Sequence, residues 1–252
     1  MFLWYADTMS LRDAALWVSA LAASMWALGL FMQGRLHWLE VLTLQSGALA
    51  TLGSIGMVEL ANLSKPMTMV FAIIFVAARA RQTGAIARFD VLLAIALAFS
   101  LAGDVFLMPP DQFIPGLASF LVAHVFYIVL FRQGLGWFPS RGAVMAVFAV
   151  GALMYSIVLP GLTDPILRVA VAAYVTVISL MVSQAIGRAA VLGDTASRWV
   201  ALGAGVFMVS DALIAINKFV TPVPQASLWI LITYYCAQML IAHHARPAVS
   251  RT

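Results

Sequence analysis

Charged residues are scarce in this chain of 252 residues: they make up 10% of it, while 63% is hydrophobic and the mean hydropathy is +1.00. Soluble domains carry about 25% charged residues. A single soluble core of this size could not hide so much apolar surface from water, so the surrounding solvent is lipid. The composition predicts an all-α, polytopic transmembrane helical bundle, and we expect residues 1–252 to form a single domain.

Cysteine is nearly absent as well. Cys236 is the only one, and it lies in an apolar run, which excludes a disulfide framework and a zinc-ligand cluster. The first 13 residues lack the Lys/Arg-rich start of a secretory signal. The net charge is +4, but the basic residues occur singly or in small groups between apolar runs, so we predict no nucleic-acid partner. Nothing in the sequence predicts a protein partner.

Nine segments have roughly the length and apolar character of a membrane span, which needs about 20 residues. They are 14–32, 39–60, 65–79, 87–108, 113–132, 142–161, 165–187, 197–217 and 226–243. The third segment is short. Ser64 is its predicted N-cap, Pro66 lies in its predicted first turn, and Lys65 would sit at its outer end.

The basic residues alternate between connections. The connections after the third, fifth and seventh segments and the C-terminal tail carry most of the arginines, whereas the intervening ones carry mainly aspartates. The positive-inside rule therefore places the Arg-rich connections and the C-terminus in the cytoplasm. With nine spans the N-terminus would be outside, although only Arg35 supports the connection after the first segment.

Two aspartates lie inside predicted spans, where an ionised carboxylate costs about 2.5–3.5 kcal/mol on insertion scales. Asp104 precedes Pro109 by five residues, and Asp211 precedes Asn217 by six. Both helices would run from inside to outside, so each carboxyl group would lie about 7–9 Å below the outer end of its helix. The two groups should then share a depth and face one cavity that a lipid can reach.

Further polar residues fall at compatible depths, and six helices would bring them toward the outer half of the bundle. They are Lys65, His124, Tyr127, Tyr174, Asn217, Tyr234, Tyr235 and Gln238. The pairs His124–Tyr127 and Tyr234–Gln238 each share a helix face. Structural interpretations stay open: hydrogen-bonded aspartates, a packing histidine, packing aromatics, and a lysine that extends to the head groups.

Several motifs occur in the order and spacing of a known family. They are Ser64-Lys65-Pro66-Met67-Thr68, Gly103-Asp104, the series Phe113, Gly116, Phe120, His124 and Tyr127, then Gly203-Ala204 with Phe207 and Ser210-Asp211, and Tyr235 with Gln238. From about residue 60 to 243 the chain resembles the YhhN family. Animal members are lysoplasmalogenases, which hydrolyse the vinyl-ether bond of a lysoplasmalogen to a fatty aldehyde and a glycerophospho head group.

The resemblance implies a catalytic pair, Asp104 and Asp211, in a site lined by Lys65, His124, Tyr127 and Gln238. It implies eight helices, so that segment 14–32 would be additional. It also implies a lysophospholipid substrate among membrane lipids, no cofactor and no metal, and a place in the inner membrane of a bacterium. The substrate does not follow from the family alone, because one fold can carry different activities.

Two carboxyl groups suit this reaction. Protonation of a vinyl-ether carbon gives an oxocarbenium ion, water adds to it, and the hemiacetal collapses to aldehyde and alcohol. Two carboxyl groups in a dry pocket share one proton, so that one acts as general acid and the other stabilises the cation, as in glycosidases. The sequence does not assign the two roles.

Three other functions stay open. A proton-coupled carrier also needs paired intramembrane aspartates. A metal-dependent hydrolase could use His124 with both aspartates, although catalytic zinc sites usually hold more histidines. The same pair could also serve a lipid-binding protein.

Overall fold

The computed structural model describes residues 25, 27–34, 36–54, 58–82 and 88–247, and this part of the chain is helical apart from its connections. The helices are α2 (Trp38–Gly53), α3 (Val58–Gln82), α4 (Arg88–Phe106), α5 (Phe113–Arg132), α6 (Arg141–Val158), α7 (Pro165–Leu192), α8 (Thr195–Phe219) and α9 (Ala226–His244). A short 3-10 turn, η3 (Leu159–Gly161), follows α6. The predicted all-α class is confirmed.

Seven helices within the described ranges, α3 to α9, are long and apolar enough to cross a membrane. The chain is therefore an integral membrane protein. Helix α5 has the predicted bounds, and the largest difference among α4 to α9 is at the end of α7, which reaches Leu192 instead of 187. Most of the predicted segment 14–32 is not among the described residues, although residues 27–32 are helical. The N-terminus, which we expect on the extracellular side, is also not among them.

The predicted boundary between the second and third segments was wrong. Helix α2 ends at Gly53, its 16 residues falling short of a full span, and α3 already begins at Val58. Ser64 is therefore not an N-cap, and Lys65 and Pro66 lie inside α3 rather than at its start. Helix α2 therefore ends well before the proline that we used as the signal.

Side-chain hydrogen bonds support the helix around Pro66. Proline in a helix interior lacks one backbone hydrogen bond and costs about 3 kcal/mol relative to alanine. The carbonyl group of Ser64 accepts hydrogen bonds from the hydroxyl groups of Ser46 at 3.1 Å and Thr68 at 2.9 Å. The carbonyl group that Pro66 leaves without its helical partner is that of Asn62, so these bonds strengthen the turn beside the proline without replacing the missing one.

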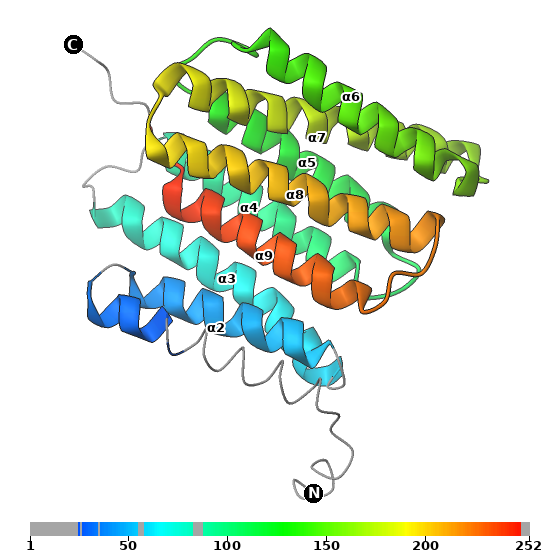
Figure 1. Cartoon of the computed structure of the whole chain (residues 1–252). Coiled ribbons are helices and arrows are strands. Elements are labelled where there is room, and N and C mark those ends of the chain that lie inside the picture. The colour runs from blue at the N-terminus through cyan, green and yellow to red at the C-terminus, as the bar shows by residue number, and fades with distance from the viewer. Residues whose placement is uncertain (1–24, 26, 35, 55–57, 83–87, 248–252) are drawn as a thin grey trace, which may run out of the picture.

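Seven of the described helices form a ring around a buried centre. In it α3 contacts α4, α4 contacts α5, α5 contacts α7, α7 contacts α8 and α8 contacts α9, while α2 lies against both α9 and α3 and completes the closure. Helix α6 lies outside the ring and packs on α7 (Figure 1). The centre of the ring holds large side chains that are fully buried, among them Tyr127 and Phe207.

Arginines join the helix ends at the side of the bundle where the basic connections lie (Figure 1). Arg79 donates to the carbonyl groups of Ala242 at 2.7 Å and Ala245 at 3.2 Å, and it pairs with Asp90. Arg188 donates to carbonyl groups at the end of α5 and in the segment after α9. Because these bonds satisfy carbonyl groups that a helix end leaves free, they hold this end of the ring closed.

Asp194 caps the start of α8 at the same end. Its carboxylate accepts hydrogen bonds from the backbone N–H of Ser197 at 2.7 Å and from the Ser197 hydroxyl at 3.0 Å. The backbone bond, followed by the hydroxyl bond, favours the ionised form, so the pKa of Asp194 lies below its ordinary value.

We expect Asp194→Ala to lower the free energy of unfolding by about 1 kcal/mol at neutral pH. Since the folded-state pKa is lowered, the carboxylate stabilises the fold above the pKa of the unfolded chain, and this contribution is lost as the pH falls through the folded pKa. Thermal unfolding in detergent at neutral and acidic pH measures both effects. Asp194→Asn, which keeps an acceptor but does not titrate, is the control. A difference in unfolding free energy between wild type and Asp194→Ala that increased at acidic pH would contradict the assignment.

Candidate functional site

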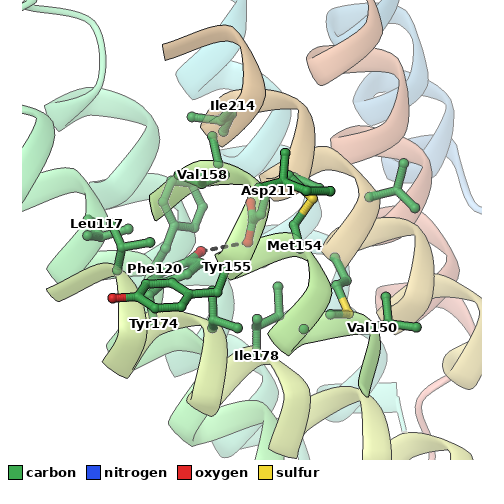
Figure 2. A pocket seen from close by; sticks show the side chains of 18 of the residues that line it. Leu117, Phe120, Val150, Met154, Tyr155, Val158, Tyr174, Ile178, Asp211 and Ile214 are labelled. Atoms are coloured by element: carbon green, nitrogen blue, oxygen red, sulfur yellow. Dashed lines mark hydrogen bonds between the residues drawn. The ribbon is translucent and has the colours of Figure 1, made fainter. Parts of the chain in front are cut away.

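A cavity of about 330 Å³ lies between α5, α6, α7 and α8 and reaches the connection from α4 to α5. Its wall is almost entirely aliphatic and aromatic, and the polar side chains that line it are Tyr155, Tyr174 and Asp211. Figure 2 shows Asp211 among the apolar side chains of the neighbouring helices. A mostly apolar cavity of this size with a few convergent polar groups is typical of a small-molecule site.

Asp211 on α8 is hydrogen-bonded across the cavity wall to Tyr174 on α7. The tyrosine hydroxyl donates to Oδ2 at 2.6 Å, the dashed line in Figure 2. His124 on α5 lies behind this pair, with its Nε2 atom 3.8 Å from the same oxygen. The side chain of His124 is 0% exposed, and neither ring nitrogen has a hydrogen-bond partner among the described residues.

Asp104 on α4 forms the corresponding bond to α9. The hydroxyl of Tyr234 donates to its Oδ2 atom at 2.8 Å. Lys65 on α3 interacts electrostatically with this carboxyl group, and so does Asp211. Asp211 lines the cavity, whereas Asp104 is not among the residues that line it. That one small molecule touches both carboxyl groups therefore stays a prediction.

The predicted distances from the helix ends were wrong for both aspartates. Helix α4 ends at Phe106, two residues after Asp104, because a residue that precedes proline disfavours the helical conformation and Pro109 follows closely. Helix α8 continues to Phe219, eight residues after Asp211. The two carboxyl groups therefore lie at different distances from the ends of their helices.

Two phenylalanines lie next to the tyrosine that bonds Asp104, and one of them also contacts His124. The rings of Phe120 and Phe207 pack edge-on against each other, with centroids 6.2 Å apart, and both pack edge-on against Tyr234. On the other side Phe207 contacts His124, with centroids 4.8 Å apart, and His124 contacts Tyr174. The arrangement is thus a continuous row of aromatic rings with one carboxyl group at each end.

Tyr127 and Gln238 meet beside this row. The Tyr127 hydroxyl donates to Oε1 of Gln238 at 2.6 Å, and both side chains are buried. Tyr235 lies next to Tyr234 and turns toward α2, where its ring leaves little space above Gly47. The structure therefore gathers Tyr127 and Gln238 with the central polar residues and directs Tyr235 to the edge of the cluster.

Asn217 does not join this cluster through its side-chain oxygen, contrary to our prediction. That oxygen accepts a hydrogen bond from the backbone N–H of Val223 at 2.9 Å, in the connection from α8 to α9. Because an amide oxygen near a helix end readily bonds a following backbone N–H, Asn217 stabilises this connection.

Two features were not predicted from the sequence. They are the packing of Phe120 against Phe207 in the row of rings, and the contribution of α6 to the cavity wall. An aromatic residue in an apolar helix carries no signal of its own. Gly103 did carry one: a Cβ atom there would come within 2.5 Å of the Phe120 ring, so glycine is required beside Asp104 for that ring to pack. The described ranges contain no group of three or more His, Cys, Asp or Glu side chains with the arrangement of a metal site.

Comparisons with known proteins agree with the motifs. The model of the YhhN family matches residues 60–245. Lysoplasmalogenase TMEM86A of Bos taurus is 39% identical over 154 residues, which are 59% of this chain and 62% of that protein. The human protein of that name is also 39% identical, over 59% of this chain and 62% of its own length.

A bacterial relative matches as well. The protein named lysoplasmalogenase of Mycobacterium bovis is 33% identical over 58% of this chain and 57% of its own length. The chain thus spans about 60% of the length of these relatives. No solved structure matches. Since the family model covers most of the chain and includes every residue of the cluster described above, the chain belongs to the YhhN family.

Proposed function

We propose that this protein is an intramembrane hydrolase that cleaves the vinyl-ether bond of a lysoplasmalogen. The observation that carries the proposal is the carboxyl group of Asp211, bonded to Tyr174 in the wall of an otherwise apolar cavity. An apolar cavity suits the hydrocarbon chain of a lysophospholipid, and the carboxyl group supplies a proton where the chain joins the ether oxygen. Similarity to proteins named lysoplasmalogenase supports this substrate class.

The proposed reaction begins with transfer of a proton from Asp211 to the vinyl-ether carbon that is remote from oxygen. The resulting oxocarbenium ion adds water at the carbon bound to oxygen. The proton released by this water returns to Asp211, and the hemiacetal then breaks to the fatty aldehyde and the alcohol of the head group. One water is consumed and the acid is regenerated, as general acid–base catalysis requires.

Tyr174 and His124 act on Asp211 in this scheme. Tyr174 fixes the orientation of the carboxyl group through its 2.6 Å hydrogen bond. His124, 3.8 Å from the same oxygen and without a hydrogen-bond partner within the described ranges, is placed to relay the proton. Both therefore act through Asp211, Tyr174 by orienting the carboxyl group and His124 by exchanging a proton with it.

Asp104 is the second carboxyl group of the proposed mechanism. Lys65 interacts electrostatically with it, and the hydroxyl of Tyr234 donates to its Oδ2 atom at 2.8 Å. A negative Asp104 behind the aromatic row stabilises the oxocarbenium ion through a medium of low dielectric constant. We assign the acid to Asp211 and the stabilising charge to Asp104.

A carrier built on the same residues would have to open at both ends. The end of the ring with the basic connections is joined by the hydrogen bonds of Arg79 and Arg188 to carbonyl groups of neighbouring helices. Breaking several such bonds in every cycle disfavours alternating access. This observation supports a hydrolase that is reached from one side.

We further propose one transmembrane domain in the inner membrane of a bacterium, with the arginine-rich end and the C-terminus in the cytoplasm. The common location of the basic connections at one end supports this orientation (Figure 1).

We expect Asp211→Asn and Asp104→Asn each to lower kcat on a lysoplasmalogen by at least ~100-fold, because an amide neither donates the acid proton nor carries the charge. An amide oxygen still accepts the tyrosine hydrogen bond, so the variants should fold. Aldehyde release by purified protein measures the rate, and Asp111→Asn in the exposed connection after α4 is the matched control. Retained aldehyde release by a folded Asp211→Asn protein would refute the assignment of the acid.

Tyr174→Phe removes a hydrogen bond to a carboxyl group, worth about 1.5–3 kcal/mol, and should lower kcat roughly 10- to 100-fold with little change in KM. Tyr155→Phe is the control, because Tyr155 lines the same cavity but donates instead to the carbonyl group of Arg168. An equal loss of kcat in the two variants would contradict this role of Tyr174, because it would show that either tyrosine hydroxyl affects the rate without orienting Asp211.

The substrate class is tested by turnover of a lysoplasmalogen beside an ester lysophospholipid with the same head group. We expect aldehyde from the first and no fatty acid from the second, since the mechanism protonates a carbon–carbon double bond that an ester lacks. If neither lipid yields aldehyde, the carrier or lipid-binding function is favoured instead.

A further inference from the structure

The cavity is a slot that runs alongside α8. Gly205 and Ala215 both line it and are ten residues apart, which corresponds to roughly 15 Å along the helix. Asp211 lies between them, four residues from Ala215 and six from Gly205. The carboxyl group therefore divides the slot into an outer part, near the connection from α4 to α5, and a longer deep part.

The deep part is wholly apolar. Its lining, which we call the deep end, is formed by Gly151, Ile178, Gly205 and Met208. These residues lie in the middle of α6, α7 and α8, whereas the outer part is lined by residues of the helix ends, such as Phe113. Any group that reaches the deep end from Asp211 must be a hydrocarbon, because no polar side chain lines this part.

The slot also meets the lipid-facing side of the bundle. Val150, Leu153 and Ile157 on α6 and Val209 on α8 line it, and each is between 46% and 62% exposed. Helix α6 lies outside the ring and packs mainly on α7, so the space between α6 and α8 is spanned by these side chains. In a membrane, exposed apolar residues at the middle of a span face hydrocarbon.

We infer that the slot takes the single hydrocarbon chain of the lysolipid, which enters sideways between α6 and α8, and that the deep end with Gly205 sets the chain length accepted. The inference rests on the proposed function and extends it to specificity. With the vinyl-ether bond at Asp211, the head group points past the outer part toward the helix ends, and the remainder of the chain extends toward Gly205.

Gly205 differs from the nearby Gly203 in what a side chain would meet. A Cβ atom at Gly203 would lie 3.0 Å from Ile241 and Leu240 of α9, so that glycine serves close helix packing. A Cβ atom at Gly205 would meet nothing within 4 Å. A larger residue at position 205 therefore has free space to occupy, and that space belongs to the slot.

The test compares Gly205→Leu with wild type on a short-chain and a long-chain lysoplasmalogen that share a head group. One methylene in an apolar pocket is worth roughly 10- to 200-fold in specificity. We expect kcat/KM for the long chain to fall at least ~10-fold relative to the short chain. Gly142→Leu is the matched control, because Gly142 is an exposed glycine in α6 with equally open surroundings and does not line the slot.

An equal change on both chain lengths, or no change, overturns the inference while turnover of the vinyl ether still supports the proposed function. If Gly205→Leu does not fold, Gly205→Val provides the same comparison with a smaller side chain.

A second measurement does not need turnover. A lysophospholipid with a photoreactive group at the end of its chain is cross-linked to the wild-type protein, and the modified peptides are identified. We expect modification at Ile178 or Met208 of the deep end. Modification confined to exposed residues outside the slot, such as Met145 or Leu202, overturns the inference, whatever the activity of the protein.

Discussion

A carboxyl group inside a membrane protein has to find its hydrogen-bond partner within the protein, because lipid offers none. This constraint organises the bundle. Asp104 bonds Tyr234 and thereby joins α4 to α9, while Asp211 bonds Tyr174 and joins α8 to α7. The first bond connects helices that are distant in sequence, and the second connects two consecutive helices. The carboxyl groups to which we assign the chemistry therefore also hold neighbouring helices together.

The two ends of the ring are built differently. At one end, arginine side chains bond the carbonyl groups of several helices, and Glu40 of α2 contacts His243 of α9. These bonds hold α2, α3, α5 and α9 together where the chain is most polar. On the side of α6 the helices are joined mainly by apolar contacts, with one hydrogen bond from Tyr155 to the carbonyl group of Arg168, and there the cavity lies. A bundle held rigidly at one end and by apolar contacts beside α6 can admit a hydrocarbon without losing its fold.

The sequence predicted the spans from α4 to α9 and the central polar residues, because length, hydropathy and intramembrane charge are strong and local signals. It misplaced the start of α3, since Pro66 indicates a helix start in water, whereas here hydroxyl groups of Ser46 and Thr68 bond the backbone next to it. It did not predict the aromatic row between the aspartates. Phe120 and Phe207 acquire that role only from the positions of neighbouring helices, which hydropathy does not encode.

His124 decides between a structural and a chemical interpretation of the cluster. A buried polar group without a hydrogen bond costs about 1–3 kcal/mol, so a histidine retained only for packing should bond a neighbour. Tyr127, one turn away and equally buried, does so through Gln238. His124 instead keeps both nitrogens unbonded within the described part of the chain, 3.8 Å from the aspartate that lines the cavity. An imidazole 3.8 Å from a carboxyl group that lines the cavity is placed for proton transfer, and this position favours a reaction at Asp211 over a purely structural cluster.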